Sequence, residues 1–305
     1  MKALAIDLGG TKMAVAVFSE DGVILEKHVH PLGSRSGEAV GAMITEAVQN
    51  MQKHEFHAVG IAVPGISRRQ TGTVWAPNIP GWENYPLLKE VNAVAGPLPV
   101  RIEGDRSCYI MGEAWKGGAQ GCSNAIYLAV GTGIGAGIMA DGCLLHGASD
   151  ISGAIGWMAL QRPFLDEYTA CGCFESMASG EGIAKVAAAL AGREAGYAGP
   201  LKKDQLQAKD VFDAYQQKDR IAFTVINQCI ELWGMAAANL VSLFNPEKII
   251  FGGGVFGPAV QFLPAIAAEA ARWAQPVSME QVRFEASALH SDAGLYGAAC
   301  LAFHA

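Results

Sequence analysis

The chain has 305 residues, about the length of two domains of ~150 residues each. Hydrophobic residues make up 51% of it and charged residues 17%, a balance that excludes an intrinsically disordered chain. With 22 basic and 29 acidic residues the net charge is -7, and no cluster of Lys or Arg stands out. Nucleic acid and anionic membranes are therefore not expected as partners.

The N-terminus and the cysteines indicate a cytoplasmic protein. Asp7 interrupts the first apolar run after a few residues, so no secretory leader is expected. The uncharged stretch 249–268 reaches the ~20 residues that a membrane span needs. It holds three consecutive glycines and two prolines, which predicts a strand, a loop and the start of a helix instead. Seven cysteines without a dense spacing pattern indicate reduced thiols.

The first half of the chain predicts three antiparallel strands followed by alternating helices and strands. Short apolar or β-branched runs are separated by Gly-Gly and Glu-Asp-Gly turns. Apolar residues at helical spacing predict a helix over 40–51, and another is expected from residue 105 to about 115. The expected strands are 4–7, 13–18, 23–30, 59–63 and 100–102.

The second half repeats this order. Residues 125–146 again read as strand, glycine turn, strand, Asp-Gly turn and strand. A polar segment, 192–219, is expected to be a surface insertion. Two such copies would place their glycine turns face to face across a cleft, where α/β sheets bind ligands. The later expected elements are a long helix over 222–244, a strand at 248–251, a helix from about 258, a strand near 282–286 and a last helix after 292.

Three glycine-rich segments are candidates for binding a nucleotide. The segment 7–12 joins two strands and combines glycines with Thr11 and Lys12, although a plain hairpin turn explains it equally well. The segment 131–137 has glycines at alternate positions, which cost ~0.5–1 kcal/mol each in a strand and favour a closely approaching ligand. The glycines 252–254 follow a strand and open a helix. None matches a Walker loop or a Rossmann fingerprint.

These segments, together with 103–105, 172–175 and Ser179-Gly180, resemble the ROK sugar kinases of the actin-like ATPase superfamily, from residue 4 to the last helix. The resemblance implies an α/β fold of duplicated ribonuclease H-like domains flanking a central cleft. Residues 1–116 with 293–305 would form one domain and residues 117–292 the other. It also implies an ATP-dependent sugar phosphotransferase that works with Mg²⁺ and forms a homodimer.

The resemblance assigns the nucleotide site as well. The phosphates of ATP are expected on the first two glycine turns and the adenosine beside the third. Asp7 is expected to position the water shell of Mg²⁺. The nucleotide-binding residues implied in this way are Asp7, Gly9, Gly10, Thr11, Lys12, Gly131, Thr132, Gly133, Gly135, Gly252, Gly253 and Gly254.

Asp105 is the candidate catalytic residue. It follows a predicted strand and precedes a helix, where a carboxylate can reach a bound hydroxyl and accept its proton. The same position suits a helix N-cap, and the two roles are compatible. Because Asp105 matches the catalytic aspartate of the family, the general base is the favoured interpretation.

The sugar pocket departs from the family pattern. Gly104 stands where the family has Asn, and Ala154 and Trp157 replace Glu and His of a Gly-Glu-x-Gly-His segment. A lost hydrogen-bond partner changes sugar discrimination by several kcal/mol, so the acceptor is expected only as a hexose or derivative (glucose, an N-acylhexosamine or a glucoside), at its 6-hydroxyl. Trp157 either stacks on a sugar or aglycone or fills the volume of an absent metal site. The expected substrate-binding residues are Gly65, Asn78, Gly104, Asp105, Trp157 and Glu175.

A structural zinc ion is not expected. The family binds it through that His and three Cys, whereas this chain has Trp157 and only Cys171 and Cys173 in the segment, two of the four ligands that structural zinc needs. The alternative function is a non-catalytic sugar-binding regulator or sensor, because ROK repressors share this domain. Those carry an N-terminal winged helix, and the first strand here is expected to start at Ala3, which favours the kinase.

Overall fold

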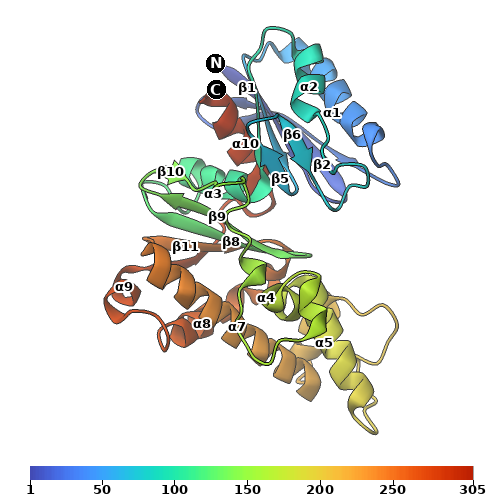
Figure 1. Cartoon of the computed structure of the whole chain (residues 1–305), viewed down its shortest axis with the longest axis vertical. Helices are drawn as coiled ribbons and strands as arrows, with labels where there is room; N and C mark the ends of the chain where they lie inside the picture. Colours follow the sequence, from blue (N-terminus) through green and yellow to red (C-terminus); the bar gives the residue numbers. More distant parts are fainter. Residues whose placement is uncertain (305) are drawn as a thin grey trace.

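The computed structural model describes residues 1–304, and two five-stranded sheets form its framework (Figure 1). The strand orders are β3-β2-β1-β4-β7 and β10-β9-β8-β11-β12. Each sheet comes from one half of the chain. In each half the first three strands in chain order pair antiparallel, and the last two strands run parallel to the first strand of that half. The two halves therefore share one topology, which confirms the predicted duplicated α/β fold.

The first sheet and its helices agree closely with the sequence-based prediction. The hairpin β5–β6 was missed, because three-residue strands are too short to show a clear alternation. The elements are β1 (Lys2–Leu8), β2 (Lys12–Ser19), β3 (Ile24–Pro31), α1 (Glu38–Met51), η1 (Gln52–His54), β4 (Val59–Val63), β5 (Ile66–Arg68), β6 (Thr73–Trp75), α2 (Leu87–Ala95), β7 (Val100–Gly104) and α3 (Asp105–Lys116).

The second half continues with the same strand pattern and a larger helical layer. Its elements are β8 (Ala125–Val130), β9 (Ile134–Ala140), β10 (Cys143–Leu144), η2 (Ile155–Trp157), η3 (Asp166–Thr169), α4 (Cys173–Ala178), α5 (Gly180–Arg193), α6 (Ala208–Gln216), α7 (Arg220–Phe244), β11 (Lys248–Gly252), η4 (Gly254–Phe256), η5 (Pro258–Phe262), α8 (Leu263–Ala270), α9 (Pro276–Gln281), β12 (Arg283–Ala286), η6 (His290–Asp292) and α10 (Ala293–Phe303).

The segment 192–219 is not merely a surface insertion, so that expectation was wrong. Its helix α6 packs against α5 and α7. Leu201, Val211 and Phe212 are buried in the core of the second half. The segment looks polar because its buried apolar residues are few, while most of its charged residues are exposed.

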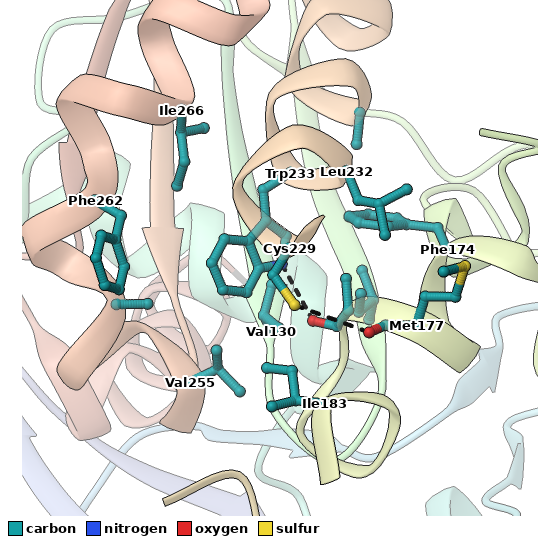
Figure 2. Packing of buried hydrophobic residues seen from close by; sticks show 14 of the residues in the cluster. Val130, Phe174, Met177, Ile183, Cys229, Leu232, Trp233, Val255, Phe262 and Ile266 are labelled. Carbon is teal, nitrogen blue, oxygen red and sulfur yellow. Dashed lines mark hydrogen bonds between the residues drawn. The ribbon is translucent and has the colours of Figure 1, made fainter. Parts of the chain in front are cut away.

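Helix α7 forms the centre of that core (Figure 2). It is long and apolar enough to cross a membrane by length and composition, but 61% of its apolar window is buried inside the protein. The indole nitrogen of Trp233 donates a hydrogen bond of 3.1 Å to the carbonyl of Ala178. Figure 2 shows Phe174, Ile183 and Val255 in the same cluster of buried side chains as Trp233. Protein side chains therefore cover most of this helix, as expected for a core helix.

Helices α3 and α10 lie between the two sheets and pack against each other. Their backbones touch, since a Cβ on Gly297 would collide with the carbonyl of Cys108. Helix α10 packs on β1 and β4, and α3 packs on β8 and β9. Figure 1 accordingly shows α10, at the end of the chain, beside the first strand. The domain boundaries 1–116 with 293–305 and 117–292 remain a proposal, and residue 305 lies outside the described residues.

Candidate active site

The fold brings Asp7 and Asp105 to the same edge of the first sheet. Strands β1, β4 and β7 run parallel, with Asp7 opposite Ala62 and Val63 opposite Gly104. Asp105 follows immediately as the first residue of α3. Both carboxyl groups therefore lie where the parallel strands end, and the charge of Asp105 raises the pKa of Asp7.

The pKa of the Asp7 carboxyl is strongly perturbed. Burial, followed by the nearby Asp105, raises its pKa to about 7, although Lys12 opposes the shift. Within residues 1–304 its carboxylate accepts no hydrogen bond. It packs against the start of α10, where a Cβ on Gly294 would collide with it. A partly exposed carboxylate beside a second carboxylate fits a Mg²⁺ ion held through its water shell.

The carboxyl of Asp105 is held by its own helix. Oδ1 accepts a hydrogen bond of 2.8 Å from the backbone N–H of Arg106, and Oδ2 accepts one of 3.4 Å from the hydroxyl of Tyr109. Gly104, not Asp105, is the N-cap residue of α3. Burial raises the pKa of Asp105, and the charge of Arg106 and these hydrogen bonds oppose that shift.

The first glycine turn is open to solvent. The N–H of Gly9 donates a hydrogen bond of 2.9 Å to the carbonyl of Lys12 and closes the turn between β1 and β2. Gly10, Thr11 and Lys12 are exposed. A Cβ on Gly10 would lie 3.8 Å from the Cβ of Asn78. Asn78, expected at the sugar, thus lies beside the expected phosphate turn.

The second glycine turn has a different explanation from the one expected. Cβ atoms on Gly133, Gly135 and Gly137 would collide with the Glu175 carboxylate, the Arg106 side chain and the Arg106 carbonyl. These glycines therefore make room for other parts of the protein. Gly131 differs, because a Cβ there would meet nothing within 4 Å.

In the third glycine segment, too, some glycines are required by the protein itself and one faces open space. A Cβ on Gly252 would collide with the hydroxyl of Tyr127, and Gly253 has a φ of +88°. A Cβ on Gly254 would meet open space. Ala129 lies opposite Gly252 in the parallel pair β8–β11, so Gly131 and Gly254 both follow strand ends at one edge of the second sheet. Bare backbone next to open space at both positions fits a nucleotide.

Of the remaining expected sugar residues, Gly104 directly precedes Asp105 and Gly65 lies beside Gly104. A Cβ on Gly104 would come within 3.2 Å of the Gly65 carbonyl. On the other side Glu175 accepts a hydrogen bond of 2.6 Å from the N–H of Ile134. Burial raises the pKa of Glu175, and this N–H opposes the shift.

Trp157 does not fill a vacated volume, since it is 58% exposed. That alternative is therefore wrong, and a stacking role stays a prediction. Nearby, the Sγ of Cys171 lies 3.2 Å from the hydroxyl of Ser176, and Cys173 is buried in the core. Within the described residues, no group of three or more His, Cys, Asp or Glu side chains is placed to hold a metal ion. The absence of zinc stays a prediction.

Sequence reasoning missed Arg106 and Tyr109, and the structure adds His146 next to the site. Nε2 of His146 lies 2.8 Å from Oε2 of Glu103, which directly precedes Gly104. Arg106 follows Asp105 directly, and Tyr109 lies four residues after it on the same face of the helix. Their closeness to Asp105 in the sequence was the signal that could have found both residues.

Comparison with known proteins decides the family. The profile of the ROK family matches residues 3–305. The chain belongs to the ROK family. This ROK chain is 32% identical to the glucokinase of Halalkalibacterium halodurans over 96% of the chain and 92% of that protein.

Other ROK proteins are similar as well. The structure of a ROK glucokinase from Streptomyces griseus in complex with glucose and AMPPNP matches with a TM-score of 0.82 and 30% identity, covering 100% of both chains. The xylose repressor of Caldicellulosiruptor bescii is 36% identical over 64% of this chain and 49% of that protein. The ROK family thus contains both kinases and regulators that resemble this chain.

Proposed function

We propose that this ROK chain transfers the γ-phosphoryl group of ATP to the 6-hydroxyl of a hexose or hexose derivative, with Asp105 as general base. One observation carries the proposal: the Asp105 carboxylate stands beside Asp7 at the carboxyl edge of the parallel strands. The similarity to a glucokinase along 96% of the chain supports it. So does the similarity to a structure that holds glucose and an ATP analogue.

The residues of this chain have separate tasks in such a transfer. Asp105 accepts the proton of the attacking hydroxyl, and its carboxylate must be ionised to do so. The charge of Arg106 and the hydroxyl of Tyr109 favour that ionised form. Thr11 and Lys12 face the phosphates from the first turn. Asp7 would hold Mg²⁺ through water, and a bound ion neutralises charge on the transferred phosphoryl group.

The acceptor and the assembly are further parts of the proposal. Gly65, Asn78, Glu175 and the exposed Trp157 are the proposed sugar contacts, with Gly104 leaving space beside Asp105. The protein would act as a homodimer in the cytoplasm, without nucleic acid or membrane as partner. All seven cysteines are free thiols, which agrees with a reducing compartment.

An ADP-release assay coupled to a dehydrogenase tests the function. The acceptors are D-glucose, N-acetyl-D-glucosamine, N-acetyl-D-mannosamine and a β-glucoside, each with ATP and Mg²⁺. We expect ADP release that depends on one of these acceptors, with a sugar phosphate as product in mass spectrometry. Sugar binding in calorimetry without any phosphorylated product would refute the kinase and favour the regulator.

A further inference from the structure

Two residues of the first turns of α3 hold the Asp105 carboxylate, one at each oxygen. Its Oδ2 accepts from the Tyr109 hydroxyl at 3.4 Å. Its Oδ1 accepts from the Arg106 backbone at 2.8 Å and lies 3.9 Å from the guanidinium Nε of the same residue. A carboxyl with both oxygens engaged cannot rotate freely about its last bond.

Tyr109 is itself fixed by the second sheet. Its ring packs against that of Tyr127 on β8, with centroids 5.1 Å apart. Burial, followed by the nearby Asp105, raises the pKa of Tyr109 well above its usual value. The hydroxyl therefore stays protonated and can only serve Asp105 as a donor.

Arg106 is fixed by the second half as well. Its Nη1 donates a hydrogen bond of 3.3 Å to the carbonyl of Gly153. Its side chain runs across Gly135 on β9, where a Cβ would collide with it. The Arg106 side chain is only 22% exposed, so it is held by its neighbours and does not move freely in solvent. The glycine at 135 is what allows the guanidinium to lie beside Asp105.

We propose that Arg106 and Tyr109 are positioning residues that orient the Asp105 carboxylate toward the sugar hydroxyl. Each acts through Asp105, and each is anchored in the second half of the chain. The orientation of the base thereby depends on how α3 packs against β8 and β9. This proposal rests on the proposed function, because it gives these side chains a task only if Asp105 is the base.

A double-mutant cycle tests the proposal. Tyr109→Phe and Arg106→Met are each made in the wild-type chain and in Asp105→Asn, and kcat and KM are measured with the best of the four acceptors named above. We expect Tyr109→Phe to lower kcat by about tenfold, as for a lost hydrogen bond to a charged group. Arg106→Met keeps the backbone N–H that bonds Oδ1 and removes only the ion pair at 3.9 Å, so its kcat should fall less, by about threefold. The KM for ATP should stay within about twofold in both variants. In Asp105→Asn the same changes should lower kcat no further, since the base they orient is absent.

Matched variants separate positioning from general damage. Tyr85→Phe removes a hydroxyl that bonds to Glu90 at 2.6 Å and lies against α1, and Arg272→Met removes a cation paired with Glu269. Both should leave kcat unchanged. Arg106→Lys, which keeps the charge but not the planar fork, should retain a kcat between those of wild type and Arg106→Met. Thermal unfolding of every variant checks that the fold persists.

Three outcomes would overturn the proposal. Unchanged kcat in both Tyr109→Phe and Arg106→Met would refute positioning while leaving the kinase intact. An equal loss of kcat with and without Asp105 would show that the two residues only support the fold. Wild-type protein that phosphorylates none of the four acceptors would refute the proposed function, and this inference with it.

Discussion

The perturbed carboxyl of Asp7 makes stability depend on pH in an unusual direction. Its pKa is about 7 in the folded chain against 3.8 for the ordinary carboxyl. Between these values the folded protein keeps a proton that the unfolded chain has lost. The free energy of unfolding that Asp7 contributes is therefore largest below pH 3.8, falls as the pH rises, and reaches its minimum above about pH 7.

The variant Asp7→Asn isolates this effect, because Asn stays neutral at every pH. A tenfold difference in proton affinity between the folded and unfolded chains corresponds to ~1.4 kcal/mol. The variant should therefore gain stability over wild type by about 2–3 kcal/mol more at pH 8 than at pH 5, with the lower value applying if water reaches the half-buried carboxyl. The variant should also lose sugar-dependent ADP release, since stability is exchanged for function at such sites.

The measurement is urea unfolding followed by tryptophan fluorescence, at pH 5 and pH 8, in EDTA and without nucleotide. The matched control is Asp141→Asn, a change at the exposed turn between β9 and β10. A stability difference between Asp7→Asn and wild type that is the same at both pH values would refute the reasoning. Addition of Mg²⁺ and an ATP analogue at pH 8 should narrow the difference, because bound cation compensates the buried charge in wild type.

Four further predictions concern the site and its support. Asp105→Asn should lower kcat by roughly 10²–10⁴-fold, the range for a lost general base, while calorimetry still finds ATP and sugar binding; an unchanged kcat would remove Asp105 from that role. Glu113→Ala should destabilise the fold by about 2 kcal/mol or more in urea unfolding, because it leaves the buried hydroxyl of Ser287 and the partly buried N–H groups of Leu289 and Gly118 without their acceptor; a loss below about 1 kcal/mol would contradict this. Elemental analysis should find well under one zinc per chain, because Cys171 and Cys173 supply two thiolates at most; stoichiometric, chelator-resistant zinc would disprove it. Sugar and a non-hydrolysable ATP analogue should improve each other's affinity about 5–150-fold by closing the cleft, and identical affinities in paired titrations, with an unchanged scattering radius, would mean that the halves are rigid.

Local signals were sufficient for most of the secondary structure. Strand β4 has the bounds expected from its apolar run, and β8 and β9 lie within 125–146 in the expected order. A buried strand and the glycine turn after it are recognisable within a few residues. The duplication also followed from the sequence alone, since two copies of one strand order leave the same pattern of turns. The position of Asp105 at the end of β7 followed from the same local reading.

The reasons for individual residues required the tertiary structure. The alternate glycines after Gly131 indicated a ligand in the sequence, yet Gly133, Gly135 and Gly137 make room for Glu175 and Arg106. The partners of these glycines come from other elements of the chain. No local pattern contains such a contact, because a missing Cβ looks the same whether a ligand or a side chain occupies the space.

The electrostatics of the site depended on the fold in the same way. Asp7 and Asp105 are ordinary carboxylates in the sequence, and only the parallel pairing of β1, β4 and β7 brings them together in a buried place. The sequence by itself determined which elements form, in which order, and which aspartates end the strands. Packing decided which charges meet and which glycines remain open, because distance and desolvation depend on neighbours from the whole chain.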